Sequence, residues 1–170
     1  MQETDLIITP GRVTDNHSGP LVVFVIGMRI NHFHKVGRWL PVFKAMGPML
    51  RELYSNPESG FLGTEFALTS PRQILLLQYW QDFDALETYA RNSEAQHWPA
   101  WTAFNKAIGN DGTVGIYHET YAVAAGAHES VYVNMPPFGL GRFAGLVPAT
   151  GSRNAARERM RVSAGTGGEA

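Results

Sequence analysis

Cysteine is absent from this chain of 170 residues. Its absence excludes disulfides, thiolate nucleophiles and metal sites built on cysteine. Net charge is also nearly absent, at -1, because 14 basic residues face 15 acidic ones. We therefore expect neither nucleic acid nor membrane as a partner, since both attract basic surfaces. Long apolar runs are missing too: residues 21–28 form the longest run near the N-terminus, far short of the ~20 residues of a membrane span.

The first residues are polar and acidic, which is not the pattern of a secretory signal. A chain without cysteine is compatible with a reducing compartment, so we take the cytoplasm as the default location. The hydrophobic fraction of 44% is normal for a soluble protein that buries a core. The length fits one domain with tails.

The apolar spacing predicts a strand, a helix, a hairpin, a helix and a strand. Residues 21–30 are apolar and β-branched, which predicts a buried strand, and Gly27 indicates a bulge or the close approach of another backbone. Residues 36–54 have helical spacing, but we expect Pro48 to kink or split that helix. The order indicates an α+β fold: a ferredoxin-like split βαβ unit with an antiparallel sheet and helices on one face.

The later elements complete this order. Residues 61–69 and 74–80 are predicted to form the hairpin, and Asp82 to cap the second helix. A further helical piece follows at about 93–108, and residues 114–123 are predicted to form the last strand. Because the helices cover one face of the sheet only, the apolar opposite face predicts a homodimer that packs sheet against sheet.

Three parts are expected along the chain. Residues 1–19 form an extended arm, residues 20–135 the α+β domain, and residues 136–170 a loop followed by a tail. A short strand is expected at 130–134. The last ~20 residues are rich in glycine, alanine, serine and arginine, so we expect disorder there. The arginines of that tail are expected to be solvated, with phosphate binding as the alternative; they are Arg153, Arg157, Arg159 and Arg161.

The segment 93–105 gathers large aromatic side chains around a histidine and a proline. Proline breaks the hydrogen-bond ladder of a helix, so His97 is expected at a helix junction. Trp98, Trp101 and Phe104 would provide apolar walls beside it. Such a segment fits a substrate pocket, and it also fits an ordinary aromatic core helix.

Eight segments resemble one protein family: VIGMRIN (25–31), MLRELY (49–54), GFLG (60–63), QYW (78–80), HWPAW (97–101), FN (104–105), GIYHETY (115–121) and YVNMPPFGLG (132–141). Together they span roughly residues 20–150. They resemble small monooxygenase-like proteins related to the monooxygenase of fumagillin biosynthesis, within the dimeric α+β barrel superfamily. The resemblance implies a homodimeric, monooxygenase-like oxidoreductase of secondary metabolism. It would act with O2 on a hydrophobic metabolite or xenobiotic, without flavin or nicotinamide.

The resemblance also implies site residues. Haem-using members of the superfamily place the proximal iron ligand late in the second helix, where His97 lies by order of elements. Cofactor-free members hold an enolisable substrate with polar groups at the end of the first strand and with a tryptophan. Arg29, Asn31 and Trp80 have comparable positions. His97 would then be an acid–base group, or a metal ligand only if the protein depends on haem.

Several roles stay open. His118 is either a general base or an ordinary strand histidine, and Arg29 either orients substrate or forms a structural ion pair, for example with Glu119. His32 and His34 would bind metal only if a third ligand converged on them. Trp80, Trp98, Trp101 and Phe104 are expected as substrate-binding walls. Besides the cofactor-free monooxygenase, the alternatives are a haem-dependent enzyme with His97 on iron and a non-catalytic protein that binds a small ligand.

Overall fold

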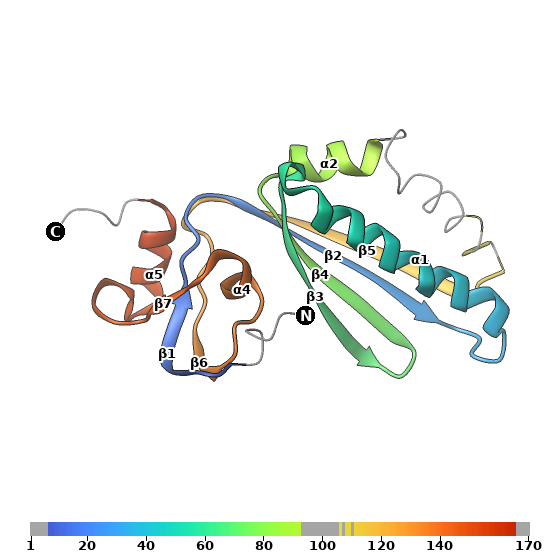
Figure 1. Ribbon diagram of the computed structural model, residues 1–170, viewed down its shortest axis with the longest axis horizontal. Helices are drawn as coiled ribbons and strands as arrows, with labels where there is room; N and C mark the ends of the chain where they lie inside the picture. The colour runs from blue at the N-terminus through green and yellow to red at the C-terminus, as the bar shows by residue number, and fades with distance from the viewer. Residues whose placement is uncertain (1–6, 93–105, 107, 110, 166–170) are drawn as a thin grey trace. The chain divides into compact units, whose positions relative to one another are not determined.

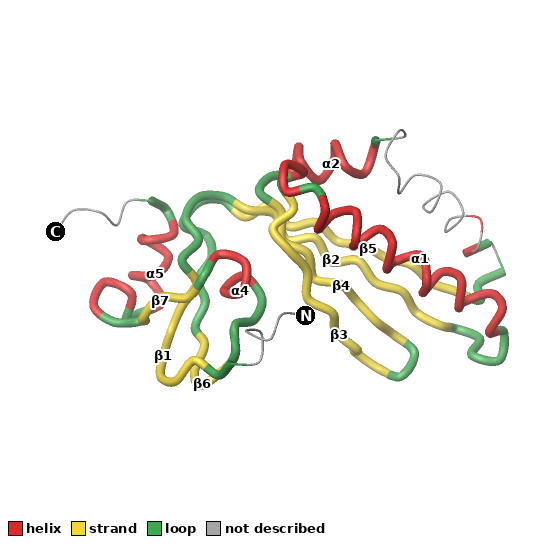
Figure 2. Tube along the Cα trace, viewed as in Figure 1, coloured by secondary structure: helices red, strands yellow, loops and turns green. Residues whose placement is uncertain are grey.

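The structure is a computed structural model that describes residues 7–92, 106, 108–109 and 111–165. The chain forms two compact units. One consists of Val23–Tyr121, and the other of Met1–Val22 together with Ala122–Ala170. Figure 1 follows the chain through both units, and Figure 2 distinguishes their helices from their strands. Within the described residues, no helix has both the length and the apolar character needed to cross a membrane.

The Val23–Tyr121 unit has the predicted order of elements. These are β2 (Leu21–Ile30), α1 (Val36–Ser55), η2 (Pro57–Ser59), β3 (Phe61–Ser70), β4 (Gln73–Trp80), α2 (Phe83–Arg91) and β5 (Val114–Val123). The four strands form one sheet in the order β3-β4-β2-β5, with β3 and β4 paired as an antiparallel hairpin. This is the ferredoxin-like split βαβ arrangement, so the expected α+β fold class is confirmed.

Local chemistry explains where these elements begin and end. Asp82 caps α2, because its Oδ1 accepts a 2.7 Å hydrogen bond from the Ala85 N–H. The hairpin register places Phe61 opposite Trp80, and their rings meet edge to face at 5.2 Å between centroids. Trp80 is fully buried and Met28 is 2% exposed, so the core lies on the sheet face that α1 and α2 cover.

Two details of this unit differ from expectation. The helix α1 runs unbroken from Val36 to Ser55 through Pro48, which neither splits nor ends it. The apolar side chains before and after Pro48 lie against the same sheet, and that packing holds the helix together despite the missing N–H donor. At Gly27 a close approach does occur, but a side chain makes it: a Cβ there would lie 2.5 Å from the Tyr117 ring.

The second unit is built around a small sheet. Its elements are β1 (Thr9–Asp15), β6 (Tyr132–Met135), α4 (Leu140–Ala144), β7 (Leu146–Pro148), η3 (Gly151–Arg153) and α5 (Ala156–Ser163). The sheet order is β6-β1-β7, and β1 pairs antiparallel with both neighbours. The expected arm at 1–19 therefore contains a central strand. The expected strand at 130–134 is found at Tyr132–Met135.

The disorder predicted for the tail is wrong for its described residues, because α5 forms there. Arg159 in α5 is only 6% exposed. Its Nε and Nη2 donate to Glu129 Oε2 at 2.8 and 2.6 Å, and its Nη1 donates to the carbonyls of Arg153 and Asn154. These four hydrogen bonds hold α5 against the rest of its unit. Arg159 is therefore not solvated, although the composition of the tail favours solvation of its arginines.

Candidate functional site

An apolar cavity lies between the sheet and the two helices of the Val23–Tyr121 unit, with a volume of about 130 Å³. We call it the apolar cavity. Most of its lining is aliphatic or aromatic: Phe24, Ile26, Gly27, Met28, Met46, Met49, Leu50, Leu53, Leu76, Gln78, Trp80, Leu86, Tyr89, Ala90 and Ile116. Ligand pockets commonly combine such a lining with a few polar groups.

Two elements, β2 and α1, shape this cavity through their side-chain periods. Alternate residues of β2 face it, from Phe24 to Ile26 to Met28. One stripe of α1 faces it from above, with Met46, Met49, Leu50 and Leu53 at helical spacing. Methionine side chains are flexible and adapt to ligands of different shape.

The cavity has two neutral polar contacts near its α2 end. The indole Nε1 of Trp80 donates a 3.1 Å hydrogen bond to Gln78 Oε1, and both side chains are buried. Burial, together with the nearby charge of Glu52, raises the pKa of Tyr89 well above its usual range. Tyr89 therefore keeps its phenolic proton at neutral pH. These groups can orient a polar substituent of a ligand that is otherwise apolar.

The candidate residues of the first strand lie on the other face of the sheet. A Cβ at Gly115 would lie 3.8 Å from Cβ of Arg29, whereas the next residue, Ile116, lines the apolar cavity. Arg29 Nε donates to Asn31 Oδ1 at 3.2 Å, and Asn31 Nδ2 donates to the Gly112 carbonyl at 2.9 Å. Arg29 and Asn31 thus form a pair at the sheet end and do not join Trp80 in the cavity.

The structure also places Glu119 and His118, two residues of β5 that the sequence analysis considered. Glu119, which we considered as an ion-pair partner of Arg29, accepts a 2.6 Å hydrogen bond from the Tyr121 hydroxyl. His118 is exposed, and its ring lies 5.6 Å from the ring of Phe24, a lining residue of the cavity. The imidazole therefore borders the cavity from its rim. A general-base role for His118 stays a prediction.

The segment 93–105 lies outside the described residues, and with it His97, Trp98, Trp101 and Phe104. Their expected roles stay predictions. Among the described residues, the lining of the apolar cavity contains no histidine that could bind haem iron, so the haem alternative depends on His97. The rings of His32 and His34 lie 5.9 Å apart, and the described part of the chain has no third residue that completes a metal site with them.

A second apolar hollow, of about 350 Å³, opens beside the beginning of α1. Its lining is Met28, Ile30, Trp39, Leu40, Phe43, Pro71, Arg72 and Ile74. We call it the Arg72 groove. The sequence suggested only a turn at 70–72, so Arg72 was missed as a functional candidate. A single arginine after a turn carries no distinctive sequence pattern, and only the fold brings its guanidinium beside apolar side chains.

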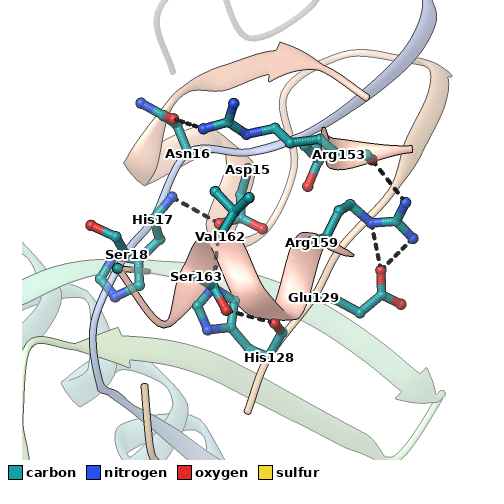
Figure 3. A pocket seen from close by; sticks show the side chains of 12 residues that line it. Asp15, Asn16, His17, Ser18, His128, Glu129, Arg153, Arg159, Val162 and Ser163 are labelled. Atoms are coloured by element: carbon teal, nitrogen blue, oxygen red, sulfur yellow. Dashed lines mark hydrogen bonds and ion pairs between the residues drawn. The ribbon is translucent and has the colours of Figure 1, made fainter. Parts of the chain in front are cut away.

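The other unit contains a polar pocket of about 240 Å³, shown in Figure 3. Asp15 lies at its base, where Oδ2 accepts from the Ser130 hydroxyl at 2.7 Å and Oδ1 accepts from the His17 N–H at 2.9 Å. His128 Nε2 lies 3.5 Å from the same carboxylate. Burial raises the pKa of Asp15, but the contacts with His128, Ser130 and the His17 N–H outweigh burial and lower it overall.

The solved structures that resemble this chain include two aldoxime dehydratases. The complex of aldoxime dehydratase (OxdRE) with butyraldoxime is 22% identical, with a TM-score of 0.61 over 79% of this chain and 40% of that one. Another aldoxime dehydratase is 19% identical, with a TM-score of 0.63 over 86% of this chain and 46% of that one. At these identities the likeness concerns the fold, and it agrees with the α+β assignment.

The sequence comparisons define the family. Monooxygenase af470 of Aspergillus fumigatus is 29% identical over 133 residues, which are 73% of this chain and 46% of that protein. The chain thus spans about half the length of this curated relative. The family described as Monooxygenase af470-like matches residues 21–140, which include the whole four-stranded sheet and both of its helices. The match covers well over half of the sequence and confirms the resemblance seen in its motifs, so the chain belongs to the Monooxygenase af470-like family.

Proposed function

We propose that this chain is a monooxygenase-like oxidoreductase that acts with O2 on a hydrophobic small molecule, such as a secondary metabolite, without flavin or nicotinamide. The apolar cavity carries the proposal. In a member of a monooxygenase-like family, it offers an apolar chamber lined by three methionines and with two polar contacts. The activity that Monooxygenase af470 has by name belongs to a protein about twice as long, so its transfer to this chain is part of the proposal.

Cofactor-free oxygenation needs a substrate that supplies its own electrons. A base removes a proton from an activated CH2 group, and the carbanion passes its electrons to O2 while a C–O bond forms. Loss of water then leaves a carbonyl, so that CH2 and O2 become C=O and H2O. An apolar surrounding suits this chemistry because it excludes water and keeps the carbanion from simple reprotonation.

Individual residues would divide this work. Trp80 and the methionines would hold the apolar body of the substrate, and the Gln78–Trp80 pair would orient one polar substituent. His118 at the rim, or His97, would take the proton. Arg29 and Asn31 lie on the sheet face opposite the cavity, so we assign them no contact with the reacting atoms.

The alternatives give different observables. If the protein depends on haem, His97 would hold the iron, and haem would supply the oxidation chemistry. Protein purified with haem available would then show a Soret band that His97→Ala removes. A non-catalytic binding protein would bind hydrophobic ligands without consuming O2.

The test is oxygen uptake with a panel of enolisable polyketides, quinols and terpenoids. We expect at least one compound to consume O2 with a protein that has no Soret band. Met49→Trp, which fills the cavity, should abolish uptake, and the exposed Arg51→Gln should not. Ligand binding without uptake across the panel would contradict the catalytic proposal.

A further inference from the structure

We propose that the apolar cavity and the Arg72 groove together bind an elongated apolar molecule with an anionic end. The anion would lie at Arg72, and the apolar chain would extend beneath α1 toward Trp80. This inference rests on the proposed use of the apolar cavity as the substrate site, and it deepens that proposal by naming the chemical class of the ligand.

The two hollows are adjacent, because Met28 lines both of them. Along α1, the groove uses Trp39, Leu40 and Phe43, and the cavity uses four later residues of the same helical stripe, which ends at Leu53. From Leu40 to Leu53 this stripe extends roughly 20 Å along the helix axis, at 1.5 Å per residue. The combined site is therefore long and narrow.

The sheet continues the same line from below. Alternate residues of β2 face it in order, from Phe24 and Ile26 in the cavity, through Met28, to Ile30 in the groove. Met28 is 2% exposed and lies between the two hollows. Met28 packs with the buried Val42 and Val114 in the core. A linear chain would therefore pass from groove to cavity only when the unbranched Met28 side chain changes its rotamer.

Arg72 gives this line a charged end. Its Nη1 donates to the Asn31 carbonyl at 3.1 Å, and its guanidinium lies 5.6 Å from the centroid of the Phe33 ring. In the part of the chain that the structure describes, no carboxylate pairs with Arg72. A guanidinium with remaining donors beside an apolar groove is suited to a carboxylate or phosphate of a ligand.

The charges around Arg72 reinforce this preference. Arg29 donates to the side-chain Oδ1 of Asn31, and Arg72 donates to the main-chain carbonyl of the same residue. Lys35 and Arg38 share the single carboxylate of Asp111, at 3.5 and 3.6 Å. The described part of this sheet end therefore has more cations than carboxylates, and its field attracts an anion toward the groove.

The test compares decanoate with decan-1-ol, which have the same chain length and differ in the charge of one end. Isothermal titration at low salt should show that decanoate binds about tenfold tighter than the alcohol, equal to ~1.4 kcal/mol. Arg72→Gln should reduce this ratio to near one, and Arg72→Lys should keep part of it. Arg51→Gln removes an exposed arginine of α1 that lines neither hollow, so it should leave the ratio unchanged.

Chain length and direction give two further readouts. From hexanoate to dodecanoate, affinity should rise about fourfold per methylene, equal to ~0.8 kcal/mol. A decanoate with bromine next to the carboxylate should quench the fluorescence of Trp39, and this quenching should be lost in Trp39→Phe. A decanoate with bromine at the far end should quench the fluorescence that remains in Trp39→Phe, because its bromine lies near Trp80. Equal affinity for acid and alcohol, or an unchanged ratio in Arg72→Gln, would overturn the inference. Carboxylate binding that depends on Arg72, together with no O2 uptake across the panel of enolisable compounds, would refute the oxygenase proposal and leave this inference standing.

Discussion

At the scale of single residues, Arg159 shows why composition misjudged the end of the chain. Four arginines among small and polar residues are typical of a solvated tail. Whether one of them is buried depends on Glu129, 30 positions earlier, which accepts two of its hydrogen bonds, including the shortest. No local pattern connects these two residues. Long-range pairing of this kind is the part of the fold that the sequence does not display.

Replacing Arg159 should therefore destabilise the unit that contains α5. Arg159→Gln would leave two carbonyls and one carboxylate without their donors, and Glu129 is about one-third exposed. We expect a loss of about 2–3 kcal/mol in the free energy of unfolding, less than for a fully buried pair. Arg157→Gln on the exposed side of the same helix should change it by less than ~0.5 kcal/mol. Urea unfolding measures both, and equal effects would contradict the assigned role.

Asp15 should make the free energy of unfolding of its unit depend on pH in the acidic range. Its pKa is lowered in the folded state from an ordinary value of 3.8. A lowered pKa contributes stability that is present above pH 3.8 and is lost as pH falls through the folded value. Asp15→Asn should therefore be less stable than the wild type at pH 6, and the gap should narrow below pH 4. Unfolding curves between pH 3 and 6 test this, and a constant gap would refute it.

At the scale of elements, the hairpin and the cap of α2 could be predicted because their causes are local. Apolar segments on both sides of a short turn indicate β3 and β4, and Asp82 marks the beginning of α2. The course of α1 through Pro48 could not be predicted this way. The penalty of proline is local, but the packing that outweighs it comes from the sheet, which the helix sequence does not contain.

Part of the candidate site could also be predicted from the sequence, and part of it could not. Trp80 was expected as a pocket wall, and it lines the apolar cavity. Arg29 and Asn31 share a face, as strand alternation requires, but alternation does not tell which face the helices cover. The structure places them opposite the cavity, and it adds Gln78, Tyr89 and Arg72, whose positions depend on how distant elements pack.

The contact between β2 and β5 at Gly27 should tolerate no added side chain. A Cβ there would lie within 2.6 Å of three atoms of Tyr117. Gly27→Ala should lower the free energy of unfolding by about 1–3 kcal/mol through overpacking. In the double variant with Tyr117→Ala, the two losses should not add, because the smaller side chain at 117 removes the clash. Gly37→Ala on α1 meets nothing within 4 Å and should cost nothing. Thermal unfolding separates these cases, and an unaffected Gly27→Ala would contradict the close approach.

At the scale of the whole molecule, the predicted homodimer would bury the sheet face opposite the helices. Leu75 and Leu77 alternate with the cavity residues Leu76 and Gln78, so they face away from the helices, and both are half-buried. If two copies pack through this face, Leu75→Glu should yield monomers. Phe66→Glu is the control, because Phe66 pairs with Leu76 and lies on the helix-covered face. Analytical ultracentrifugation decides, and dimers that survive Leu75→Glu but not Phe66→Glu would place the interface elsewhere.

The central claim is that a hydrophobic ligand binds beneath α1 and α2, and the methionines report on it directly. Met28, Met46 and Met49 line the apolar cavity, whereas Met135 and Met160 lie in the other unit. With 13C-methyl-labelled methionine, titration with decanoate should shift the first three NMR signals saturably and leave the last two unchanged. Shifts at Met135 or Met160 alone, or no saturable shift at the cavity methionines, would contradict the account.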